Sequence, residues 1–269
     1  MAGVRTLSVF NFLIVVLNFL WIAAIENGFI YGYSFSKTFS QYPTYLNPAI
    51  FTYKIWTVIS ILIIVTTYLM YYGTQRVHYN LNTSHKIKKI DYLLILNQLA
   101  LGLSMVLKHN DLFIGSIICT IICLVTMLII NNRIKIHRIS LNSFTRYFIR
   151  LGFGVYTGWL MFVLSFNFAT LLVKLNLMQN EQLFYYGNIA IILIISIAML
   201  SYSYIKYLPS ISIVLVWGIY GIYHQLQFSE LPATNLVGKI LIMIMIIGGF
   251  FAVYIFYRCN NRRTSHSLT

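Results

Sequence analysis

The sequence predicts an all-α membrane protein, a polytopic bundle of about eight transmembrane helices. Of its 269 residues, 59% are apolar and only 9% are charged, whereas soluble chains are about half apolar and about a quarter charged. The apolar residues gather in runs close to the length of about 20 residues that a helix needs to cross a bilayer. These runs are apolar on all sides, without the alternation of membrane β-strands.

Eight apolar runs supply the predicted helices. The first could also be a signal peptide, since Arg5 precedes it, but its length and the residues around Glu26 do not suit a cleavage site. The fifth run is long enough to tilt, and the seventh is short and opens at Pro209, a residue that suits a first helical turn. The runs are Leu7–Ile25, Ile50–Tyr72, Ile90–Leu107, Leu112–Ile130, Phe144–Val173, Phe184–Tyr204, Leu208–Tyr223 and Leu236–Tyr257.

The segments between the runs are too short to fold alone. The two longest, residues 26–49 and 73–89, are expected to be loops, and no internal repeat or low-complexity linker is visible. We therefore expect residues 1–269 to form a single membrane-embedded domain.

The charges indicate the orientation of the chain. If the N-terminus is cytoplasmic and the runs alternate, most of the 19 basic residues fall on the inner side. Lys and Arg in short loops favour the cytoplasmic side of a membrane. Both termini are thus predicted to be cytoplasmic. The basic residues on the outer side are then Lys37, Lys54, Lys108, Lys174 and Lys239.

The net charge of +14 would be typical of a nucleic-acid-binding protein. The basic loops are short, however, and lack the interleaved aromatic residues of single-strand binding segments. Attraction to the anionic lipids of the bilayer accounts for them better. We expect the lipid bilayer as the partner and no nucleic acid.

Few residues inside the predicted helices could carry chemistry. No catalytic motif is visible, and Cys119 and Cys123 have no neighbouring His or acid with which to hold zinc. We therefore expect no enzyme, no cofactor and no metal. Uncharged polar residues do lie at depth, either as hydrogen-bonding groups between helices or as the polar spot of a ligand pocket. They are Asn11, Asn18, Asn97, Gln98, Asn167 and Asn188.

Three stretches together resemble the tryptophan-rich sensory protein (TspO/MBR, translocator protein) family. Residues 43–57 are similar to a family motif that enters the second helix, with Pro43, Pro48 and Trp56 in matching places. Residues 97–103 are similar to Q-L-A-L-N in the third helix, with Gly102 at the family Asn. Residues 165–176 are similar to Y-L-N-F-A followed by R-L-N, which ends the fifth helix.

The resemblance implies a five-helix core over residues 1–176 and three additional helices over residues 177–269, as in an extended eight-helix bacterial branch. It implies an integral protein of the bacterial cytoplasmic membrane with an apolar cavity that opens toward the first loop. The aromatic residues of that loop would form a lid over the cavity, or else an interfacial belt. The residues expected to line or shape the ligand site are Tyr45, Pro48, Phe51, Trp56, Gln98, Trp159 and Asn167.

The function expected from the resemblance is binding of a small apolar or flat ligand, a porphyrin, sterol or lipid-like molecule, as a sensor or regulator. Two alternatives stay open. One is a transporter or flippase of a small or lipidic solute, and the other is a membrane assembly partner without a ligand. The oligomeric state also stays open, with a homodimer as one alternative.

The charge distribution gives the first testable prediction. A reporter fused after Thr269 should be active only if its enzyme works in the cytoplasm, because the inner loops hold most of the Lys and Arg residues. A pair of fusions, one active inside the cell and one active outside, makes the measurement. Activity of the outside reporter alone would contradict the predicted orientation.

Overall fold

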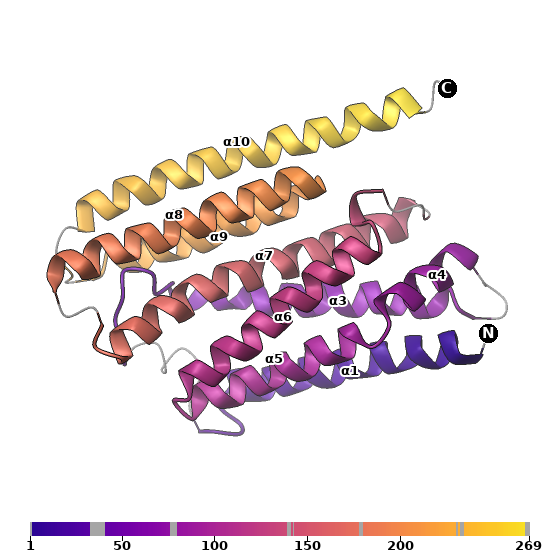
Figure 1. The fold of residues 1–269 in the computed structure, drawn as a ribbon, viewed down its shortest axis with the longest axis horizontal. Helices are drawn as coiled ribbons and strands as arrows, with labels where there is room; N and C mark the ends of the chain where they lie inside the picture. Colours follow the sequence, from indigo (N-terminus) through magenta and orange to yellow (C-terminus); the bar gives the residue numbers. More distant parts are fainter. Residues whose placement is uncertain are drawn as a thin grey trace. The chain divides into compact units, whose positions relative to one another are not determined.

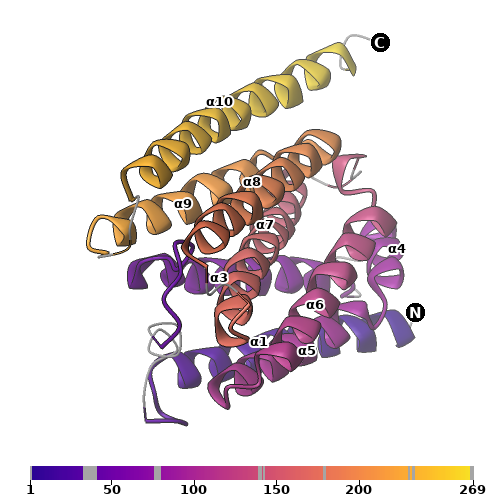
Figure 2. The same ribbon diagram turned by 60° about the vertical axis from the view of Figure 1, so that its left-hand side comes forward.

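The computed structural model describes residues 2–32, 41–75, 80–138, 141, 143–177, 180–229, 231 and 234–266, and these are almost entirely helical, with no strand among them (Figures 1 and 2). The all-α fold is therefore confirmed. The elements are α1 Ala2–Glu26, η1 Ile50–Lys54, α3 Ile55–Tyr72, α4 Leu81–Ile90, α5 Leu93–His109, α6 Phe113–Arg133, η3 Ile136–Arg138, α7 Ser143–Lys174, α8 Glu181–Lys206, α9 Pro209–Leu226 and α10 Thr234–His266.

Each predicted apolar run lies on a long helix, but fewer of these helices qualify as membrane spans than predicted. Six are long and apolar enough to cross a bilayer, or seven if α4 and α5, which are bent by 49° at their break, form one span. The run Leu208–Tyr223 corresponds to α9, which is not among these candidates. Its last two turns contain Tyr223, His224 and Gln225, which shorten its apolar part.

The segment 73–89 is not wholly the loop that we predicted, because α4 begins within it. The Asn80 side chain accepts a hydrogen bond from the Thr83 amide, which satisfies a free donor of the first turn. Thr83, Ile87 and Ile90 are buried on one face, at helical spacing. On this helix Lys86 also donates to the Ile134 carbonyl, beyond the end of α6.

The contacts divide the chain into two compact units. The first comprises residues Met1–Ser40 and Ile55–Thr157, and the second comprises Gln41–Lys54 and Gly158–Thr269. The continuous helix α7 contributes its first half to one unit and its second half to the other. The single domain expected from the sequence, with a core ending at residue 176, stays a prediction.

In the first unit α1 packs against α3 and α5, and α5 packs along α6 (Figure 1). Close approach of α3 and α7 depends on Gly152, where an added Cβ would lie 2.8 Å from Thr66 Oγ1 and 3.2 Å from the Leu62 carbonyl oxygen. The Thr66 hydroxyl also donates to the Phe148 carbonyl. Small residues of this kind let membrane helices pack backbone to backbone.

In the second unit α9 is the central helix, in contact with α8, α10 and η1. Its glycines receive larger neighbours: a Cβ on Gly218 would lie 2.6 Å from Phe162 ring atoms. A Cβ added to Gly158 of α7 would likewise lie 3.2 Å from Ile211 Cα. Close steric fit at glycines therefore contributes to the packing around α9.

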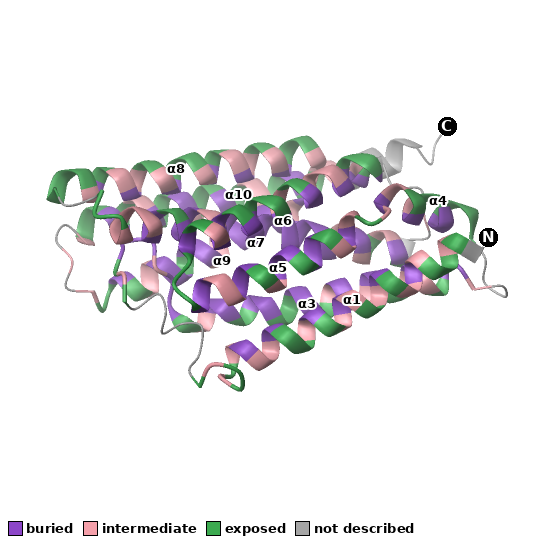
Figure 3. Cartoon of the chain, turned by 60° about the horizontal axis from the view of Figure 1, so that its bottom comes forward, coloured by how far each residue is buried: buried purple, intermediate pink, exposed green. Residues whose placement is uncertain are grey.

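Many apolar side chains of both units are exposed, as expected for helices that face lipid. Leu99 and Leu103 of α5 are each more than half exposed, and so are Ile194 and Ile197 of α8. Figure 3 shows exposed residues in green and buried residues in purple on different faces of these helices. Such extended apolar surface belongs in a bilayer, because soluble monomers rarely expose it.

Steric fit on α9 predicts the effect of adding one methyl group. Gly218→Ala should lower the free energy of unfolding by about 1–3 kcal/mol, because the fully buried Phe162 ring would have to move. Thermal unfolding in detergent measures it. The matched control is Gly249→Ala on α10, where no atom lies within 4 Å of the added Cβ. Equal melting temperatures of the two variants would contradict the packing.

Candidate ligand site

A network of polar side chains lies in the interior of the first unit, centred on Asn97 of α5. Asn97 is fully buried. Its Oδ1 accepts hydrogen bonds from the Tyr156 hydroxyl at 2.6 Å and from Gln98 Nε2 at 3.1 Å. Its Nδ2 donates to the Cys123 carbonyl at 2.7 Å and to Thr126 Oγ1 at 2.9 Å. One amide thus connects α5, α6 and α7.

Gln98 extends this network to α1. Its Oε1 accepts a hydrogen bond from Asn18 Nδ2 at 2.8 Å. Both side chains are buried, and each lies within an otherwise apolar stretch of its helix. The amide pair Asn18–Gln98 is therefore a buried polar link between α1 and α5.

An interior cavity lies on one side of this amide pair, between α1, α3, α5 and α7. Its volume is only about 20 Å³, enough for about one water molecule. Trp56 and Ser60 of α3 line it together with Tyr156 and the amide pair. The remaining walls are apolar: Val15, Phe19, Ile22, Ile59, Ile63 and Leu101.

A larger groove of about 500 Å³ lies on the other side of the pair, along α1 and α5. Trp21 borders it, and its indole N–H donates to the Gly102 carbonyl at 3.4 Å. A Cβ on Gly102 would lie 3.1 Å from Asn18 Oδ1, so the glycine keeps the groove open beside the amide. Its other walls are Ile14, Leu17, Leu99, Leu103 and Val106.

The groove opens on a face that meets lipid. Leu17 is 60% exposed, and Leu99 and Leu103 are 57% and 51% exposed. The amide pair lines both the groove and the interior cavity. A molecule that enters from the bilayer would therefore meet apolar walls, an indole ring and one polar spot.

Of the seven predicted site residues, Trp56 and Gln98 line the same cavity. The other five belong to the second unit. Tyr45 is buried there against Phe184, with ring centroids 5.0 Å apart. Burial raises the pKa of the Tyr45 phenol above its ordinary value, and the charge of Glu181 raises it further.

The other four predicted residues of the second unit differ in burial, and Phe51 is only half-buried. The Phe51 ring meets the Trp217 ring edge-on at 5.6 Å. Trp159 is fully buried and stacks on Phe162 at 5.5 Å. Pro48 and Asn167 are buried as well. A ligand role for all seven residues stays a prediction.

The sequence did not identify Asn18 and Tyr156 as site residues. Asn18 carried a signal, because it is polar at depth in an apolar run. Tyr156 carried none, since an aromatic residue in a membrane helix is usually explained by packing. Only the fold shows that its hydroxyl reaches Asn97.

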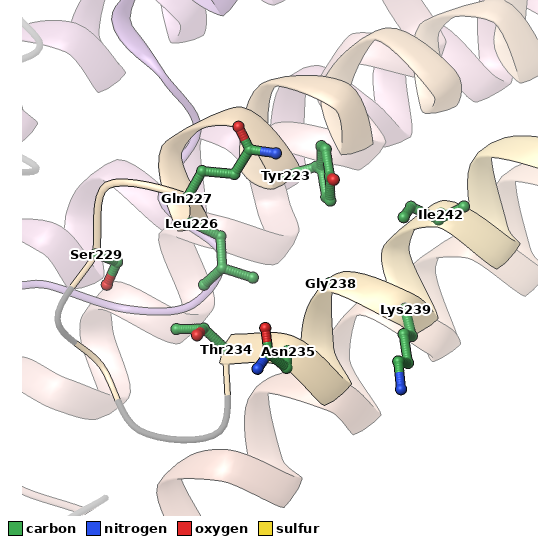
Figure 4. A pocket seen from close by; sticks show the side chains of 9 residues that line it. All are labelled: Tyr223, Leu226, Gln227, Ser229, Thr234, Asn235, Gly238, Lys239 and Ile242. Atoms are coloured by element: carbon green, nitrogen blue, oxygen red, sulfur yellow. The ribbon is translucent and has the colours of Figure 1, made fainter.

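A second hollow, of about 570 Å³, lies between the end of α9 and the start of α10 in the second unit. Figure 4 shows Tyr223, Gln227 and Lys239 around it, with the Gln227 amide and the Lys239 ammonium pointing away from each other. These two polar groups therefore do not converge on one ligand atom. Within the described residues, no three His, Cys, Asp or Glu side chains are grouped as metal ligands.

Comparison with known proteins agrees with the resemblance seen in the sequence. A family model described as TSPO-like protein matches residues 8–257, which is nearly the whole chain. No curated protein and no solved structure matches. The matched range covers most of both units and every residue of the amide network.

The network predicts an energetic coupling between α5 and α7. Asn97→Ala would leave the Tyr156 hydroxyl buried without its acceptor, at a cost of about 1–3 kcal/mol. In the Tyr156→Phe background the same substitution should cost about 1 kcal/mol less. Unfolding of the two single variants and the double variant measures this coupling. Strict additivity would contradict the hydrogen bond.

Proposed function

Because this chain belongs to the TSPO-like protein family and is an integral membrane helix bundle, we propose that it binds a small apolar ligand at the Asn18–Gln98 pair. In this role it is a sensor or regulator. Trp56 and Tyr156 would shape the inner side of the site, and Trp21 would border the outer side.

One observation carries this proposal: the same two amides line a lipid-facing groove and an interior cavity. Ligand sites are typically apolar, with a few polar groups that orient the ligand, and have volumes of about 300–1,000 Å³. The groove meets this description at about 500 Å³, whereas the interior cavity alone is too small. The ligand would therefore occupy the groove and contact the amide pair at its base.

The lining favours a neutral ligand with a single hydrogen-bond donor. Asn18 Nδ2 is bonded to Gln98, while Asn18 Oδ1 accepts no hydrogen bond in the described part of the chain. That oxygen is available to a ligand hydroxyl or N–H. None of the groove residues is basic, so nothing there would pair with the carboxylates of a porphyrin. A sterol or another hydroxylated lipid is the ligand class that fits best.

Binding of a fluorescent sterol to the purified protein in nanodiscs tests the proposal, with protoporphyrin as the second probe. Loss of one neutral hydrogen bond, about 0.5–1.5 kcal/mol, corresponds to an affinity about two- to tenfold lower. Asn18→Leu should therefore weaken sterol binding by about this factor. Asn188→Leu, a buried amide of α8 in the other unit, is the matched control and should bind like the wild type.

A groove-filling variant separates loss of the site from loss of the fold. Leu103→Trp adds bulk within the groove at a half-exposed position and should abolish sterol binding while leaving the melting temperature unchanged. Ile194→Trp makes the same kind of change on the exposed face of α8 and should have no effect. Wild-type protein without saturable binding of either probe, or equal binding by both tryptophan variants, would overturn the proposal.

A further inference from the structure

The segment Gln41–Lys54, here called the first-loop segment, is held by the C-terminal helices. It belongs to the second unit, although the helix that follows it, α3, belongs to the first. Its η1 turn contacts α9. The first-loop segment continues into α3 without a break, because α3 begins at Ile55 directly after Lys54.

Two hydrogen bonds fix the segment to α9. The Ala49 amide donates to the Gly221 carbonyl at 3.0 Å. The Trp217 indole N–H donates to the Thr52 carbonyl at 3.2 Å. Gly221 and Trp217 lie one turn apart on the same helix, so both bonds hold a short stretch of the segment to one place on α9.

The fit around this place is close. Thr52 is fully buried, and its side chain fills the space that a Cβ on Gly221 would occupy. An added Cβ there would lie 2.9 Å from Thr52 Cβ and also too close to its other side-chain atoms. Thr52 has a short, β-branched side chain, which cannot swing away as a long one would. The absence of a side chain at Gly221 therefore makes room for Thr52.

Aromatic rings of the first-loop segment also pack against α8 and α9. Phe51 meets the His224 ring edge-on at 5.3 Å, in addition to its contact with Trp217. Nearer the start of the segment, Tyr45 contacts Tyr185 of α8 at 6.0 Å. The first-loop segment thus contacts α9 through hydrogen bonds, the close fit of Thr52 against Gly221 and aromatic rings. Its contacts with α8 are between aromatic rings.

We propose that α8 and α9 form a seat for the first-loop segment, and that release from this seat regulates ligand exchange at the amide-pair site. Trp56, which lines the interior cavity, follows the seated segment by two residues. When the segment leaves the seat, the first turn of α3 loses its fixed start, and Trp56 gains freedom. The regulatory part rests on the proposed function, whereas the seat does not.

Hydrogen exchange of the full-length protein in nanodiscs tests the seat directly. Gly221→Ala should speed amide exchange in peptides covering residues 46–54 by about tenfold or more, and should raise exchange in residues 55–59 as well. Gly249→Ala, a helical glycine with open space around it, is the control and should match the wild type. Unchanged exchange in residues 46–54 of Gly221→Ala would overturn the seat.

A second variant and a ligand measurement complete the test. Trp217→Phe removes one hydrogen-bond donor and keeps an aromatic ring. It should speed amide exchange in residues 46–54 by a smaller factor than Gly221→Ala. It also keeps the test possible if Gly221→Ala does not fold. Dissociation of the fluorescent sterol should be at least threefold faster in the variants whose segment is released. If the segment is released but sterol dissociation is unchanged, the proposed regulation is wrong, whereas the seat on α8 and α9 still stands. If the wild type binds neither probe, the proposed function fails, and the seat is judged by hydrogen exchange.

Discussion

The amide of Asn97 is the constraint on which the first unit depends. Inside a bilayer no water is available to a polar group, so a buried amide must find its partners within the protein. Asn97 finds them on three sides: Tyr156 on α7, Thr126 and the Cys123 carbonyl on α6, and Gln98 beside it. Through Gln98 the same network reaches Asn18 on α1. The register of four helices is therefore fixed around one side chain.

The second unit depends strongly on close steric fit as well as on hydrogen bonds. Gly218 and Gly221 of α9 receive Phe162 and Thr52, and Gly158 of α7 meets the α9 backbone. At these contacts an added methyl group would clash with a neighbouring residue. In the amide network, the loss of a hydrogen-bond partner is more destabilising than a change in side-chain volume. The two units should accordingly differ in the substitutions to which they are most sensitive.

The long helices could be predicted because apolar runs of about 20 residues have few other interpretations. Helix α4 could not, since its four buried positions lie among lysines and its N-cap Asn80 looks like an ordinary loop residue. The polar residues at depth could be named, but not their partners. The sequence motifs near Trp56 and Trp159 also suggested one shared site, because the sequence does not show that Gln41–Lys54 packs with α9.

The length of α7 has a consequence for the membrane in which the protein works. Arg150 and Lys174 lie 24 residues apart on this helix, a rise of about 36 Å. The hydrocarbon layer of a bilayer is about 30 Å thick, and membrane helices tilt by about 20° on average. The spacing of the two cations therefore matches a bilayer of ordinary thickness. A markedly thicker membrane would draw one of these charges into lipid, so hydrophobic mismatch sets an upper limit on the bilayers that accept this chain.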